Sequence, residues 1–170
     1  MQQLQLQPFK IERVRAIGNH QTFQIPPIKK LIAEEIGEGV IIEPFPFQSK
    51  LDVFDYLDRF ADNSADYGLI DPPYSKRQVS DHYKEMGVKV TGWHTSSGWT
   101  AKVKFEVGRV MKIGGKTITF GWNSSGLGPT NGFEVTRILL VCHGGDHYDT
   151  ICTVETKVKN RVTPIQEGSE

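Results

Sequence analysis

The stretch YGLIDPPYSKRQVSDHYKEM, residues 67–86, joins a strand to a helix through an unusual corner. Tyr67 to Ile70 is an apolar run that predicts a buried strand, and Lys76 to Met86 predicts a helix. Between them, Asp71-Pro72-Pro73-Tyr74 places an acid, two prolines and an aromatic ring directly after the strand. Each proline ring holds its own φ at about −65°, so the turn is stiff. The stretch therefore predicts a strand–helix unit with a rigid acidic corner at the carboxyl end of the strand.

The same alternation of helix and strand occurs on both sides of this unit. Before it, Pro27 suits the first turn of a helix that ends near Gly37, and Val40 to Glu43 follows as a strand. A second helical pattern repeats Leu51, Phe54, Leu57 and Phe60. After the unit, we expect a helix at 99–111, a turn at Gly114-Gly115 and a strand at 116–122.

The final part of the chain has a different pattern. Two apolar, β-branched runs flank Gly144-Gly145-Asp146-His147, which indicates an antiparallel hairpin. The whole pattern predicts one α/β domain over residues 1–170 with loose termini at 1–8 and 163–170. We expect a Rossmann-like three-layer fold with a mostly parallel sheet that ends in an antiparallel hairpin at one edge.

Composition narrows the classes of partner. The 170 residues include 20 Lys and Arg and 20 Asp and Glu, so no global field attracts nucleic acid or an anionic membrane. The apolar runs are too short to cross a bilayer and the start is polar, which predicts a cytoplasmic protein.

Cys142 and Cys152 lie in strand-like runs without metal-ligand spacing. We expect buried free thiols and no metal site.

The acidic corner suits one kind of ligand. The Asp71 carboxylate and the Pro72 carbonyl are two acceptors side by side, and Tyr74 adds a flat aromatic face. Such a corner fits a planar ring that carries an amino group, such as adenine. Hydrogen bonds from both amine hydrogens would free the nitrogen lone pair for attack on an electrophilic carbon. A base inside a duplex cannot reach such a corner, so the nucleotide must be flipped out.

The tetrad also resembles the catalytic motif of the amino-methylating DNA methyltransferases, and Asp in first place is similar to the adenine-N6 branch. TFQIPPIKKLI, residues 22–32, resembles the segment of that family that packs on the methionine end of S-adenosylmethionine. VIIEPFPFQS, residues 40–49, is similar to the strand and loop of its cofactor motif. GGKTITFGWNSSGLG and ILLVCHGG…HYDTICTVE are similar to small phage-borne adenine methylases. The resemblance covers roughly residues 20–158.

This resemblance implies an S-adenosylmethionine-dependent methyltransferase fold that acts on DNA with a flipped adenine. It implies catalytic roles for Asp71, Pro72, Pro73 and Tyr74. The candidate cofactor-binding residues are Phe23, Glu43, Phe45 and Asp52.

The chain departs from the family pattern in its cofactor region. Phe47 and Ser49 stand where the family has glycines. Only one helix and one strand fit between Glu43 and Asp71, so the fold is trimmed by about one helix–strand unit. The family's ribose-binding acid lies in the missing unit, and Asp52, Asp55 or a second subunit of a homo-oligomer are the alternative sources for it.

Two alternatives remain open from the sequence. The chain is either an active methyltransferase or a catalytically degenerate form of the fold that acts as a binding or assembly protein. The aromatic stretch with Trp93, His94 and Trp99 either contacts DNA or covers the core.

Overall fold

The computed structural model describes residues 9–45, 51–73, 75–85, 87, 89–145 and 147–161. The termini that we expected to be loose, 1–8 and 163–170, lie outside the described residues. The strands are β1 (Lys10–Arg15), β2 (Ile41–Ile42), β3 (Ala65–Ile70), β4 (Met111–Gly121), β5 (Phe133–Cys142) and β6 (Thr150–Lys157). The helices are α1 (Pro26–Glu35), α2 (Val53–Leu57), α3 (Lys76–Glu85) and α4 (Ser97–Val110), with short 3-10 turns η1 (Thr22–Gln24) and η2 (Pro129–Asn131).

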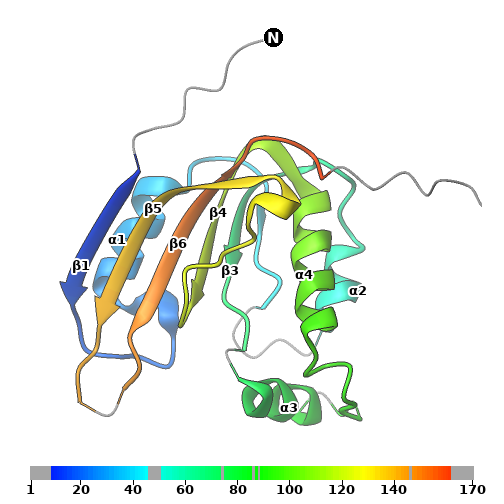
Figure 1. The fold of residues 1–170 in the computed structure, drawn as a ribbon, viewed down its shortest axis with the longest axis horizontal. Coiled ribbons are helices and arrows are strands. Elements are labelled where there is room, and N and C mark those ends of the chain that lie inside the picture. The colour runs from blue at the N-terminus through cyan, green and yellow to red at the C-terminus, as the bar shows by residue number, and fades with distance from the viewer. Residues whose placement is uncertain are drawn as a thin grey trace, which may run out of the picture.

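The described strands form one six-stranded sheet in the order β1-β5-β6-β4-β3-β2. The pairs β1–β5, β2–β3 and β3–β4 are parallel, and β6 is antiparallel to both of its neighbours. The carboxyl ends of the parallel strands therefore share one edge of the sheet, with α3 beyond it (Figure 1). The predicted α/β class and mostly parallel sheet are confirmed, and the architecture is compatible with a Rossmann-like fold.

The final hairpin forms as predicted, but its predicted place at the edge of the sheet is wrong. β6 lies between β4 and β5, and β1 covers the outer side of β5. Strand β1 is held there by Arg137, whose guanidinium contacts Glu12 of β1 together with Glu34 and Glu35 of α1. These ion pairs join residues that are far apart in the sequence, and they fix the short, charged strand β1 beside β5.

The expected turn at Gly114-Gly115 is also wrong, because both glycines lie inside β4. The pairing of β3 with β4 steps from Ala65↔Met111 to Tyr67↔Lys116, so β4 bulges over the residues between them. Gly114 has a φ of +83°, and a Cβ at Gly115 would come within 2.9 Å of the Asp66 carbonyl oxygen. The glycines therefore permit a bulge in a continuous strand.

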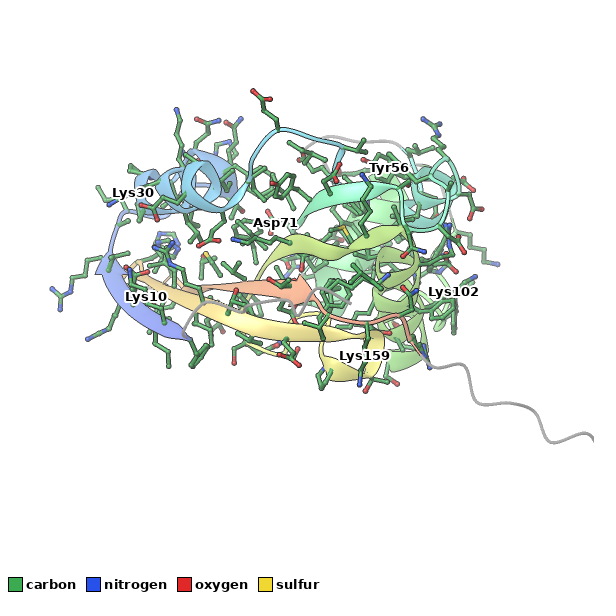
Figure 2. The ribbon with its side chains drawn as sticks, turned by 90° about the horizontal axis from the view of Figure 1, so that it is seen from above. Lys10, Lys30, Tyr56, Asp71, Lys102 and Lys159 are labelled. Atoms are coloured by element: carbon green, nitrogen blue, oxygen red, sulfur yellow. The ribbon has the colours of Figure 1, made fainter. Side chains whose placement is uncertain are left out.

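The two faces of the sheet are covered by different helices, which makes three layers (Figures 1 and 2). Strand β3 shows the division, because Leu69 belongs to the core under α1 and the next residue, Ile70, to the core under α2 and α4. The core under α1 contains Ile25, Ile28, Leu31, Leu69, Ile118, Phe120, Leu139, Val141, Cys152 and Val154. Each fully buried aliphatic side chain contributes about 1.5–3 kcal/mol.

Helix α2 is shorter than the pattern from Leu51 to Phe60 predicted. Asp52 caps its amino end by accepting from the Phe54 amide at 2.8 Å. Its carboxyl end is fixed by Arg109 of α4, which donates to the Leu57 and Phe60 carbonyls at 3.2 and 3.0 Å. In the described part of the chain, no helix is both long enough and apolar enough to cross a membrane.

Candidate functional site

The acidic corner lies where the sequence placed it, at the carboxyl end of β3. Asp71, Pro72 and Pro73 follow Ile70 directly and are half-buried, whereas Tyr74 lies outside the described residues. Figure 2 shows Asp71 at the centre of the molecule, between α1, which carries Lys30, and α2, which carries Tyr56. Because Ile70 pairs with Thr119, Asp71 lies beside Phe120 of β4. The corner therefore lies at the carboxyl edge of the sheet, between the ends of β2 and β4.

Glu43, at the end of β2, is an electrostatic neighbour of Asp71. It follows Ile42, whose register partner is Gly68 of β3. Burial, and then the negative charge of Asp71, raise the pKa of the Glu43 carboxyl. The Glu43 amide donates to the Tyr56 hydroxyl at 3.0 Å, which fixes the backbone at this point. Two carboxyl groups thus share the carboxyl edge of β2 and β3.

The charge of Asp71 also acts on β6. Burial raises the pKa of the Cys152 thiol to about 12, and the charge of Asp71 adds to that effect. Cys152 is fully buried and pairs with Phe120 across β4 and β6. Both belong to the core under α1. The prediction of two buried free thiols is confirmed for Cys142 and Cys152.

Phe23 lies on the same side of the sheet as these groups. Its ring contacts Phe120 with 5.0 Å between centroids, and it packs against the core under α1. Side chains alternate along a strand, so Asp71 follows Leu69 on this side. The structure therefore couples Glu43 to Asp71 and places Phe23 against the core on the side of the sheet to which Asp71 points.

The other two predicted cofactor residues lie on the opposite face of the sheet. Phe45 packs against the core under α4, with 6.2 Å between its ring centroid and that of Trp99. Both carboxylate oxygens of Asp52 are engaged, one by the Phe54 amide and the other by the Tyr83 hydroxyl at 2.7 Å. The alternative acid, Asp55, is an exposed residue of α2. Phe45 and Asp52 are thus engaged by contacts within the chain itself.

The aromatic stretch after α3 is divided between core and surface. Trp99 is 4% exposed and covers the core, whereas Trp93 is 47% exposed. His94 contacts the Tyr83 ring with 4.5 Å between centroids. Tyr83 therefore links α3 to α2 and to the start of α4, a role that the sequence analysis missed. The sequence signal for this role was spacing: Tyr83 follows Val79 by four residues, which places both on one face of the helix. Both side chains are buried.

Comparison with models of protein families finds no match for this chain, and comparison with curated proteins finds none either. The site is therefore defined by its own geometry. It consists of a stiff corner with an acceptor carboxylate, a second carboxyl group beside it and a phenyl ring on the same face. Such an edge can accept hydrogen bonds from a planar amine and favours positive charge nearby.

Proposed function

We propose that the chain transfers a methyl group from S-adenosylmethionine to N6 of an adenine flipped out of DNA. The observation that supports this best is the Asp71-Pro72-Pro73 corner at the carboxyl end of β3, an inner parallel strand, with Glu43 coupled to it. In open α/β sheets, ligands bind beyond the carboxyl ends of the strands. The resemblance of the tetrad to the adenine-N6 motif gives this general site a specific chemistry.

In this proposal, the corner binds and orients the amine. The Asp71 carboxylate and the Pro72 carbonyl accept one hydrogen each, which localises the lone pair on nitrogen. Hydrogen bonds to a charged acceptor contribute roughly 1.5–3 kcal/mol. Holding the amine against its reaction partner contributes up to roughly 7–11 kcal/mol, so positioning is the larger effect. Pro73 stiffens the turn, and Tyr74 provides the stacking face.

Phe23 and Glu43 are the residues that fit the cofactor. S-adenosylmethionine supplies a methyl group bound to a positively charged sulfur. The negative charge of Asp71, which also raises the pKa of the Glu43 carboxyl, favours a cation at this edge. The Phe23 ring lies on the same face as Asp71 and offers apolar contact. Phe45 and Asp52 fit less well, since Asp52 would have to release Tyr83.

A methyl-transfer assay tests the catalytic assignment. The full chain is incubated with S-adenosylmethionine labelled in its methyl group and DNA that lacks adenine methylation. We expect transfer by the native protein and a loss of at least about 100-fold in Asp71→Ala, because the carboxylate that orients the amine for attack is removed. Asp58→Ala, an exposed acid at the end of α2, is the matched control and should keep native activity. Undiminished transfer by Asp71→Ala would show that the corner is not the site.

The second candidate is a binding or assembly protein with this fold and no turnover. It is favoured by the engagement of Phe45 and Asp52 in contacts within the chain. Isothermal titration with S-adenosylmethionine separates the two candidates. Heat with a micromolar dissociation constant supports the methyltransferase, and no heat at millimolar ligand supports the binding protein.

A further inference from the structure

Strand β1 is an end strand of the sheet, and one of its edges has no strand beside it within the described part of the chain. It comes first in the strand order, and β5 is its neighbour there. The Ala16 amide donates to the Cys142 carbonyl of β5 at 3.1 Å. Backbone groups alternate in direction along a strand, so the even-numbered residues of β1 face β5. The amides and carbonyls of Ile11, Arg13 and Arg15 therefore point away from the sheet.

The side chains of the same three residues lie on the face of the sheet opposite α1. Glu12 belongs to the ion pairs that reach α1, and Val14 packs against the core under α1. Their odd-numbered neighbours therefore point the other way. Figure 1 shows α1 behind β1 and β5, and no described helix in front of these two strands. Ile11 is accordingly 67% exposed, and Arg13 and Arg15 are exposed as well.

This face of β1 is positively charged, although the chain as a whole has 20 basic and 20 acidic residues. Arg13 and Arg15 supply the charge. The acid of the strand, Glu12, lies on the other face, where Arg137 and Lys10 contact it at 2.6 and 2.9 Å. A local field of this sign attracts an acidic partner over about one Debye length, which is about 8 Å at physiological ionic strength.

One of the two arginines is held against the sheet. The Arg13 Nε donates to the Cys142 Sγ at 3.1 Å, which uses one of the five N–H donors of the guanidinium. The charge of Asp149 also acts on Arg13, and the Asp149 carboxylate accepts from the His143 amide at 3.1 Å. The guanidinium is therefore oriented before a partner arrives, which reduces the entropy that binding costs.

A second copy of β1 fits this edge poorly. In an antiparallel pair of strands, residues on the same face of the sheet lie opposite each other. Within β1, Arg13 and Arg15 would then meet another arginine or an isoleucine, because the acid lies on the other face. Like charges directly opposite each other destabilise a strand pair. The edge thus resists pairing with itself and favours a strand that carries acids on one face.

We propose that β1 binds an acidic segment of another protein as an added antiparallel strand. The outward backbone groups of Ile11, Arg13 and Arg15 pair with the backbone of that segment, which supplies affinity. Acids opposite the two arginines and an apolar residue opposite Ile11 supply specificity. From its amino end, the segment reads acid, any residue, acid, any residue, apolar residue. Three strands separate β1 from β3, which carries the acidic corner, so this inference is independent of the proposed function.

Fluorescence anisotropy with a labelled peptide tests the added strand. The probe is about seven residues long, with glutamates and an isoleucine at the stated positions and threonines elsewhere. We expect saturable binding to the full chain, and binding that weakens as salt is added. Arg15→Glu should weaken binding roughly 2- to 30-fold, because a cross-strand attraction is exchanged for a repulsion of similar size. Lys84→Glu makes the same change of net charge at an exposed position of α3, and this matched control should bind like the native protein.

Two methylated forms of the probe test the backbone pairing without any change to the protein. In the antiparallel pair, the probe residue opposite Arg13 directs its N–H group to β1, whereas the next threonine directs its N–H group away. N-methylation opposite Arg13 should weaken binding at least roughly 10-fold, because a backbone hydrogen bond is lost and the methyl group clashes with the edge. N-methylation of the threonine should leave the affinity unchanged.

The proposal is overturned if the native chain shows no saturable binding, if both methylated probes bind equally well, or if Arg15→Glu binds like the native protein. If Arg15→Glu does not fold, the methylated probes decide. Sedimentation velocity without peptide examines the other occupant of the edge. A dimer of the native chain that Ile11→Pro dissociates would show that the edge takes a second copy, and would also overturn the proposal.

Discussion

At the scale of single residues, Glu43 and Asp71 are electrostatically coupled at the carboxyl edge of β2 and β3. Burial and the charge of Asp71 together keep a proton on Glu43 to higher pH than usual. A carboxyl group whose folded pKa is raised contributes stability below its unfolded pKa, and this contribution is lost as pH rises through the folded value. Ionisation of Glu43 therefore costs stability as the pH rises.

Replacing Asp71 by Asn should lower the pKa of Glu43, because the substitution removes one cause of its elevation and keeps the size of the side chain. The pH-dependent loss of stability caused by Glu43 should shrink with it. Carbon NMR of the glutamate carboxyl groups across a pH titration measures the change. Asp58→Asn, at an exposed position, should leave the Glu43 titration unchanged. A Glu43 pKa that is the same in Asp71→Asn and the native protein would mean that the two groups are not coupled.

At the scale of elements, α3 is attached chiefly through Val79 and Tyr83, its buried residues among those described. The Tyr83 hydroxyl donates to Asp52 at 2.7 Å, and burial, with this hydrogen bond, raises the tyrosine pKa. This bond joins α3 to the residue that caps α2. The Tyr83 hydroxyl therefore adds a polar link to the apolar packing that holds α3.

Tyr83→Phe should loosen α3 and leave the sheet intact. The substitution removes a hydrogen bond to a charged acceptor, which contributes roughly 1.5–3 kcal/mol, and keeps the ring contacts with His94 and Trp99. Hydrogen–deuterium exchange should show faster exchange of α3 amides and unchanged exchange of β4 and β6. Faster exchange throughout the chain would instead indicate that the hydroxyl supports the whole core.

The elements that sequence reasoning predicted well are those fixed by local signals. Helix α1 starts at two prolines, and α3 and α4 follow from their patterns of polar and apolar residues. Strand β1 has no comparable signal, because its sequence KIERVR is mostly charged and its partner β5 is far along the chain. The bulge in β4 depends on pairing with β3, which local glycine patterns cannot reveal.

The site was likewise predictable where a general rule about strands applies, and not where residues from separate elements meet. The corner at Asp71 and its proximity to Glu43 follow from the rule that parallel strands end at a common edge. The engagement of Asp52 by Tyr83 joins residues on separate helices, and no local pattern predicts it. The outward direction of the Arg13 and Arg15 backbone groups likewise depends on the pairing of β1 with β5.

At the scale of the whole molecule, Arg137 joins three elements. Its side chain is 15% exposed and contacts Glu12, Glu34 and Glu35 at 2.6, 2.8 and 3.0 Å. The hydrogen bond from Arg137 is the main cause that lowers the pKa of Glu34. For Glu35, burial opposes ionisation, but hydrogen bonds from Lys116 and Arg137 outweigh it and the pKa is lowered. Such groups contribute stability above their unfolded pKa and lose it as pH falls through the folded value.

Arg137→Met should therefore destabilise the protein by roughly 1–3 kcal/mol at neutral pH, because three carboxylates lose a shared partner. The difference from the native protein should shrink as the pH falls and the carboxylates take up protons. Urea unfolding at pH 7 and near pH 4 measures both effects. Arg77→Met removes an exposed ion pair of 3.7 Å on α3 and should change stability by less than about 0.5 kcal/mol. A difference for Arg137→Met that is constant with pH would contradict the electrostatic explanation.

The position of β6 between β4 and β5 has a consequence for how the protein is made. Among the six strands that the structure describes, β6 comes last in the sequence, yet it is the one that joins the pair β1–β5 to the group β2–β3–β4. Its residue Lys157 also donates to the Gly108 and Met111 carbonyls at 2.8 and 2.7 Å. While the ribosome is still synthesising residues before 150, the two half-sheets have no common strand. Each half-sheet then has an unpaired edge strand, a feature that favours aggregation, until residues 150–157 have been made.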